Sequence, residues 1–319
     1  MLSAEEAALF AAHPPAGAIL FRRNVADPVQ LRALTDALHA AMPPGAPILI
    51  DQEGGRVARL RPPHWRAHPP AAAIGALFAR DARAGLRAAW LTGALIGAEC
   101  MAAGIDVVCA PVLDLRLPIT TDAIGDRAYA AEPETVAALG RAMAAGLLAA
   151  GAQPVGKHAP GHGRATVDSH LALPVVRDTD LSADLVPFAR NADLGWMLTS
   201  HILYPALDPR RPATLSPAIV GDIVRGRIGF AGVLASDDLA MKALEGTPAE
   251  LAAGALAAGC DVALYCPGDM AGTEAVLRAC PPLSTAAQAR LDAARAQAAA
   301  ARIVLDPVAL AGERDALLS

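Results

Sequence analysis

The chain has 319 residues, a formal net charge of −5, and a hydrophobic content of 54% with only 3% aromatic residues. An acidic chain that is poor in aromatic side chains lacks the basic surface and the stacking platforms of nucleic-acid binding proteins, so we expect no nucleic-acid partner. No apolar run is long enough to span a bilayer, and the first ten residues lack the basic-then-apolar pattern of a signal peptide, so we expect a cytoplasmic protein without a membrane partner.

Seven short apolar runs, each ending in polar or turn-forming residues, predict β-strands. In chain order they cover 17–21, 47–51, 106–114, 154–158, 196–201, 232–238 and 261–266. Most of them are separated by Ala- and Leu-rich segments that carry helix start and stop signals. Asp27-Pro28 opens one helix, and Thr247 opens another that ends near Gly259. A strand followed by a helix, repeated along the chain, predicts a parallel sheet.

Such a sheet is either an open doubly wound layer or a (β/α)8 barrel. No G-x-G-x-x-G follows the first predicted strand, so a dinucleotide-binding sheet loses its main support. Polar residues instead end many different strands, and a barrel gathers such residues at one rim, where its active site lies. They are Asp51, Asp114, Lys157, His158, His201 and Asp237. We therefore expect an α/β fold, a single-domain (β/α)8 TIM-type barrel over residues 1–319, which lacks its first strand or is irregular there because only seven strands are found.

The stretch KHAPGHGRATVDSH, residues 157–170, holds three histidines and raises the question of a metal site. Pro160 and Gly161 break any helical face between His158 and His162, so the H-E-x-x-H geometry is absent. The five cysteines contain no C-x-x-C pair, which disfavours structural zinc. We expect no metal.

The same stretch contains a candidate proton-transfer pair. Asp168 stands two residues before His170, where its carboxylate can accept a hydrogen bond from the ring N–H and leave the ring a usable acid. In SDDLAM, residues 236–241, two carboxylates are adjacent at the end of a strand. Neighbouring strand residues point to opposite faces, so we expect one of Asp237 and Asp238 to face the pocket and the other to cap the following helix. Asp51 directly ends another strand, which favours a pocket role.

Several ordered motifs resemble glycoside hydrolase family 3. KHAPGHGRATVDSH is similar to the K-H-F-P-G-H-G…D-S-H signature of the bacterial β-N-acetylglucosaminidases of that family, which recycle peptidoglycan. The other matching segments follow the family order along nearly the whole chain: DQEGGRVARL, IGDRAY, SHILYPALD, PATLSP and SDDLAM. The resemblance implies a barrel, no metal or organic cofactor, and a carbohydrate substrate with a terminal β-linked GlcNAc, naturally on 1,6-anhydro-N-acetylmuramic acid with or without a peptide.

The resemblance also implies roles for individual residues in a retaining mechanism. Asp237 matches the nucleophile, and His170 matches an unusual acid/base that is paired with Asp168 on a mobile loop. Gly161 and Gly163 are expected to let that loop swing. The matching sugar-binding positions are Asp51, Arg59, Arg127, Lys157 and His158.

Three other interpretations stay open at this point. A phosphorylase of the same family is one, because a neutral histidine admits an anionic phosphate where a carboxylate repels it. A metal-dependent barrel hydrolase that uses His158, His162 and Asp168 is the second. A non-catalytic sugar-binding relic is the third.

Overall fold

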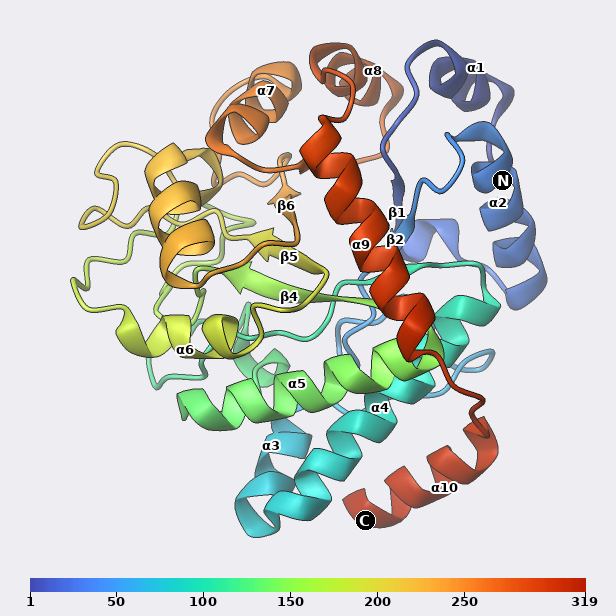
Figure 1. The fold of residues 1–319 in the computed structure, drawn as a ribbon, viewed down its shortest axis with the longest axis vertical. Coiled ribbons are helices and arrows are strands. Elements are labelled where there is room, and N and C mark those ends of the chain that lie inside the picture. Colours follow the sequence, from blue (N-terminus) through green and yellow to red (C-terminus); the bar gives the residue numbers. More distant parts are fainter.

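The computed structural model describes residues 1–319 as a parallel sheet that forms a partial barrel surrounded by helices (Figure 1). Neighbours in the sheet follow chain order: β1 (Ala18–Leu20), β2 (Ile48–Ile50), β3 (Val107–Val108), β4 (Gln153–Ala159), β5 (Trp196–Thr199), β6 (Val233–Asp238) and β7 (Val262–Leu264). Every pair of neighbouring strands is parallel. Each of the seven apolar runs therefore overlaps one strand, and the predicted parallel sheet is confirmed.

Helices connect the strands and cover their outer face: α1 (Ala4–Ala12), α2 (Pro28–Ala41), α3 (Ala71–Arg80), α4 (Ala82–Ala102), α5 (Pro133–Ala150), α6 (Ser182–Arg190), α7 (Pro248–Ala258), α8 (Met270–Ala279), α9 (Thr285–Ala301) and α10 (Pro307–Leu318). A π-helical segment, Ile219–Arg227, lies between β5 and β6. The predicted caps form: the Asp27 side chain caps α2, and Thr247 and Glu250 make a capping box on α7. None of these helices combines the length and apolar character that crossing a membrane requires.

Alternate strand residues face two different apolar cores, as expected for strands buried on both sides. On the inner face, Leu49, Val155 and Val233 pack in one core with Leu291 and Ala294 of α9. Helix α9 crosses the sheet in Figure 1, and Ala294 lies so near the start of β5 that a Cβ added to Gly195 would be 2.8 Å from its own. Helix α9 thus closes the amino-terminal end of the barrel, and the carboxyl ends of the strands remain available for a site.

The sheet is open between β1 and β7, which do not pair. A groove of about 860 Å³ lies along this seam, and its lining includes Phe10 of α1, Leu34 of α2 and Val276 of α8. The guanidinium of Arg23, after β1, donates a hydrogen bond to the carbonyl of Cys266, after β7. The barrel therefore has seven strands in place of eight, with the irregularity beside the first strand, as the strand count predicted.

Candidate active site

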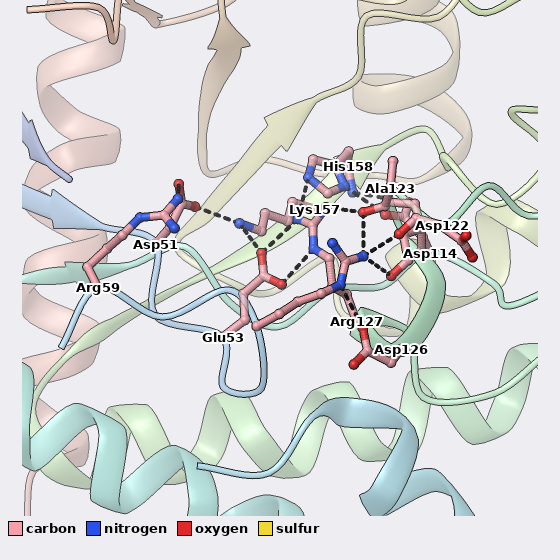
Figure 2. Close-up of polar contacts among 12 residues, drawn as sticks. Asp51, Glu53, Arg59, Asp114, Asp122, Ala123, Asp126, Arg127, Lys157 and His158 are labelled. Atoms are coloured by element: carbon pink, nitrogen blue, oxygen red, sulfur yellow. Dashed lines mark hydrogen bonds and ion pairs between the residues drawn. The ribbon is translucent and has the colours of Figure 1, made fainter. Parts of the chain in front are cut away.

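The carboxyl ends of the strands bring most of the predicted site residues to one rim. Asp51 directly follows β2, Lys157 and His158 belong to β4, and Asp237 belongs to β6. Two further predicted residues reach this rim from the segments that follow β2 and β3, namely Arg59 and Arg127 (Figure 2). Because parallel strands end at the same edge, residues that are far apart in the sequence become neighbours here.

A chain of alternating charges crosses the rim, with Lys157 at its centre (Figure 2). The buried ammonium of Lys157 donates to Asp51 Oδ1 at 2.8 Å and lies 2.7 Å from Glu53 Oε1. Arg59 donates to the other Asp51 oxygen at 3.1 Å, and Arg127 binds both oxygens of Glu53 at 2.8 Å each. Burial by itself raises the pKa of Glu53, but Arg127 and Lys157 outweigh burial and hold that pKa well below its usual range. Glu53 is therefore ionised, and direct ion pairs hold the cluster together.

A second buried pair, His158 and Asp114, lies next to this cluster. Asp114 accepts hydrogen bonds from His158 Nδ1 at 2.7 Å and from the backbone N–H groups of His158 and His162, at 3.2 and 2.7 Å. Burial raises the pKa of Asp114, but the contacts with His158 and His162 outweigh it and lower that pKa. Because an ionised carboxylate only accepts, the proton of His158 lies on Nδ1. Its Nε2 is left facing Arg127, at 3.5 Å.

The two adjacent carboxylates of β6 have different surroundings, as the sequence predicts. Asp238 Oδ1 accepts from the backbone N–H groups of Ala240 and Cys266, both at 3.0 Å, so this side chain holds together the turn after β6 and the start of the segment after β7. The only hydrogen bond to the Asp237 side chain comes from the backbone N–H of Asp238, at 2.8 Å. Asp237 therefore keeps one carboxylate oxygen free for a ligand.

Positive and polarisable groups surround Asp237. Burial raises the pKa of Asp237, but His158, His201 and Lys157 outweigh burial and lower it. His201 is itself buried, which lowers its pKa, and its Nε2 donates to the carbonyl of Asp238 at 2.9 Å. A carboxylate in these surroundings is ionised at neutral pH and is poised to act as a nucleophile or an electrostatic stabiliser.

The predicted dyad forms. His170 Nδ1 lies 2.8 Å from Asp168 Oδ1, and the backbone N–H of His170 donates to the same oxygen at 2.9 Å. Burial raises the pKa of Asp168, and these two bonds outweigh it and lower the pKa. The His170 side chain is 66% exposed, its Nε2 has no partner, and no hydrogen bond or ion pair joins the dyad to Asp237. The structure thus joins Asp168 to His170, and neither of them makes a direct bond to the nucleophile candidate.

The glycines expected to act as the hinge of this loop are packed against their surroundings. A Cβ on Gly163 would lie 2.4 Å from the carbonyl oxygen of Leu115, and Gly161 has φ +138° with its Cβ position 3.1 Å from Asp184 Cβ. Both glycines and Ala165 are buried, and exposure begins only at residue 166. The glycines therefore allow close packing at the base of the loop, so any swing of His170 has to arise in the exposed part that follows.

Arg164 anchors the same base. Its guanidinium binds Asp184 of α6 at 2.7 Å and Asp178 at 2.9 Å. On the other side of the loop, the Ser169 carbonyl accepts from the backbone N–H of Ala243, which follows β6. The dyad loop is thus attached both to α6 and to the segment that follows the nucleophile candidate.

Glu53 was absent from the predicted residues of this site, and Asp114 was predicted at the rim but given no role in binding or catalysis. Asp114 ends the third apolar run, so its position at the rim was visible, but its bond to His158 depends on the pairing of β3 and β4. Glu53 stands two residues after Asp51, and this spacing was the one available signal. No group of three or more His, Cys, Asp or Glu side chains in residues 1–319 is placed to hold a metal ion, and His158, His162 and Asp168 are no exception.

His162 is expected to make the fold sensitive to acid. Its ring is buried, Nδ1 has no partner, and burial lowers its pKa to about 4 from the usual 6.5. Between these two values the unfolded chain binds a proton that the folded chain excludes, so the free energy of unfolding falls as the pH drops from 6.5 toward 4. We expect His162→Gln to reduce the loss of stability between pH 7 and pH 4.5 by about 2–3 kcal/mol, measured by urea unfolding at both pH values.

The exposed His64 provides the matched control for this measurement. His64→Gln should leave the difference between the two pH values as it is in the unmodified protein. An equal loss of stability in His162→Gln and the unmodified protein would show that another group carries the acid sensitivity.

Comparisons with known proteins show which family and which fold the chain shares. The family model described as the glycosyl hydrolase family 3 N terminal domain matches residues 1–303. A β-hexosaminidase of Alkalilimnicola ehrlichii is 43% identical over 297 residues, which are 91% of this chain and 84% of the relative. One of Aromatoleum aromaticum is 39% identical over 301 residues, 92% of this chain and 83% of the relative. The crystal structure of NagZ from Neisseria gonorrhoeae in complex with N-trifluoroacetyl-D-glucosamine matches with a TM-score of 0.88 and 32% identity, over 100% of this chain and 95% of that one.

Proposed function

Because the chain belongs to glycosyl hydrolase family 3 and is a β-N-acetylglucosaminidase, we propose that it removes terminal β-linked GlcNAc from peptidoglycan fragments with retention of configuration. The proposed natural substrate is GlcNAc on 1,6-anhydro-N-acetylmuramic acid, with or without a peptide. The observation that carries the proposal is that Asp237 keeps one carboxylate oxygen free, while a separate Asp168–His170 dyad forms on the loop whose Ser169 carbonyl binds the segment after β6.

The sugar is proposed to bind at the charged cluster of the rim. Lys157 has one ammonium hydrogen left after its contacts with Asp51 and Glu53, and Arg127 remains able to donate beside His158. A carboxylate between two cations, such as Asp51, accepts bonds from ring hydroxyl groups. Together with Arg59, these residues offer donors and acceptors in fixed positions, which is how a rigid site orients a polyhydroxylated ring.

In the first chemical step, Asp237 is proposed to attack the anomeric carbon while His170 Nε2 donates a proton to the glycosidic oxygen. The C–O bond to the leaving group breaks and a covalent α-linked glycosyl-aspartate forms. Asp168 supports this step because its carboxylate accepts the Nδ1 proton and stabilises the imidazolium. The exposed position of His170 requires the loop to move inward when substrate binds.

In the second step, His170 Nε2 is proposed to take a proton from water. That water attacks the anomeric carbon from the β face, the bond to Asp237 breaks, and β-GlcNAc is released. Each step inverts the carbon, so two steps retain the configuration.

The test is to hydrolyse GlcNAc-1,6-anhydro-N-acetylmuramic acid in phosphate buffer and to follow the anomeric protons by NMR. We expect β-GlcNAc as the first product, before mutarotation. Appearance of α-GlcNAc first would mean single displacement, and appearance of GlcNAc 1-phosphate would mean phosphorolysis. A preparation carrying Asp237→Asn provides the blank for contaminating activity.

We further propose that residues 1–319 act as one catalytic domain and that the enzyme works in the cytoplasm. The family match over residues 1–303 supports the first proposal. The second is supported by five cysteines that are all free thiols, as is usual in a reducing compartment.

A further inference from the structure

Helix α10 lies outside the residues that the family model matches, and it packs beside α4 and α3 (Figure 1). Two arginines attach α10 to the rest of the domain. Arg87 of α4 makes two exposed bonds of 2.7 Å to Glu313 of α10. Arg314 of α10 instead points inward, and its side chain is only 5% exposed. A buried arginine is costly unless its donors are used, so the partners of Arg314 are informative.

The inward partner of Arg314 is His68. Arg314 NH1 lies 2.8 Å from His68 Nδ1, and His68 Nε2 lies 3.1 Å from Glu99 Oε2 in α4. A guanidinium only donates, so His68 Nδ1 is the acceptor and Nε2 carries the proton toward Glu99. The His68 ring is completely buried, and Arg66 holds the second oxygen of Glu99 at 3.0 Å. The position and tautomer of His68 are therefore set by α10 on one side and by α4 on the other.

From His68 the contacts continue to the turn that presents Glu53. The His68 carbonyl accepts from the Gly55 backbone N–H at 2.9 Å, and a Cβ on Gly54 would lie 2.4 Å from the Pro69 carbonyl oxygen. The turn closes through the backbone N–H groups of Glu53 and Gly54, which both donate to the Val57 carbonyl, at 2.9 and 3.2 Å. The turn is thus pressed directly onto the segment that Arg314 holds.

Glu53 is the group through which this turn reaches the rim. Both of its carboxylate oxygens accept hydrogen bonds from Arg127, and one of them also forms an ion pair with Lys157. We propose that Arg314 is a positioning residue, which acts through His68 and the Glu53 turn to orient Arg127 and Lys157 for the sugar. The inference rests on the proposed sugar-binding role of Arg127 and Lys157, and it assigns α10 a part in substrate affinity.

The test compares Arg314→Met with Glu313→Gln, because each change removes one charge that attaches α10 but only the first one touches His68. For a chromogenic β-GlcNAc glycoside we expect Arg314→Met to raise KM roughly three- to tenfold with kcat within about twofold, since looser positioning weakens binding of ground state and transition state alike. The inhibition constant of GlcNAc should rise by the same factor. Glu313→Gln should leave both constants unchanged.

Further variants separate positioning from mere stability. Arg314→Lys keeps one donor for His68, so its KM should lie between that of the unmodified enzyme and that of Arg314→Met. His68→Leu should raise KM as Arg314→Met does, and the double variant should be no worse than either single one. If Arg314→Met lowers the melting temperature but leaves KM and the inhibition constant unchanged, α10 is only a structural helix and the inference is overturned.

Arg127→Met distinguishes this inference from the proposed sugar site. If Arg127→Met leaves KM unchanged, the sugar-binding role itself is wrong. If Arg127→Met raises KM and Arg314→Met does not, the sugar site stands and the positioning role of Arg314 is wrong. Should Arg314→Met fail to fold, Arg314→Lys and His68→Leu are measured in its place: an unchanged KM in both overturns the inference, and a raised KM in His68→Leu supports it.

Discussion

Replacement of Asp237 by alanine is expected to lower kcat by at least about a thousandfold, since the covalent route disappears with its nucleophile. The surroundings favour this role because the pKa of Asp237, which burial alone raises, is lowered by His158, His201 and Lys157. The carboxylate therefore stays ionised below its usual titration range. The measurement is steady-state turnover of a chromogenic β-GlcNAc glycoside.

The neighbouring carboxylate serves as the matched control. Asp238→Asn keeps an oxygen that can accept from the Ala240 and Cys266 backbone, so we expect it to retain most of the activity. Azide added to Asp237→Ala should restore cleavage and yield α-glycosyl azide, because the small anion attacks from the α face in the space the carboxylate leaves and a single displacement inverts the anomeric carbon. Turnover like that of the unmodified enzyme in Asp237→Ala, together with inactive Asp238→Asn, would reverse the two roles.

His170→Ala is expected to lower kcat/KM by about a hundred- to a thousandfold for substrates with poor leaving groups, which need a proton in the first step. For a dinitrophenyl glycoside, whose leaving group is stable as an anion, the loss in kcat/KM should be small. The measurement is kcat/KM across a series of aryl glycosides. The slope of log kcat/KM against leaving-group pKa should become steeper in the variant.

Asp168 provides the control for this second result. Asp168→Asn removes the negative charge beside His170 Nδ1 but keeps an oxygen that accepts its proton, so its slope should lie between those of the unmodified enzyme and His170→Ala. A loss that is the same for every leaving group would show that His170 binds or shapes the loop and does not transfer the proton.

Local signals in the sequence were enough to predict the elements of the fold. The seven strands are continuous apolar runs because both faces of a parallel sheet are buried, and the caps at Asp27 and Thr247 act within one helical turn. Interactions of this short range leave a pattern that can be read without knowing what the chain packs against. The open seam beside β1 was likewise predicted, because the sequence contains only seven apolar runs of strand length and a closed barrel needs eight strands.

The candidate site was predicted only as a set of residue types and motifs. Asp168 and His170 are two residues apart, so their hydrogen bond could be foreseen from spacing. The pairing of Lys157 with Glu53 joins residues about a hundred positions apart, and nothing in either segment specifies it. The close packing of Gly161 and Gly163 shows the same limit, because the sequence does not tell a glycine that permits motion from one that permits close packing.

By itself, then, the sequence determined the strand and helix order, the seven-strand count, the dyad and the family to which the motifs belong. The tertiary structure alone decided which carboxylate of β6 stays free, which charges neutralise one another at the rim, how exposed His170 is, and that Arg314 contacts His68 behind the Glu53 turn. The physical reason is that burial, pKa and ion pairing depend on distances between strands and helices, and these distances exist only once the sheet has closed around its core.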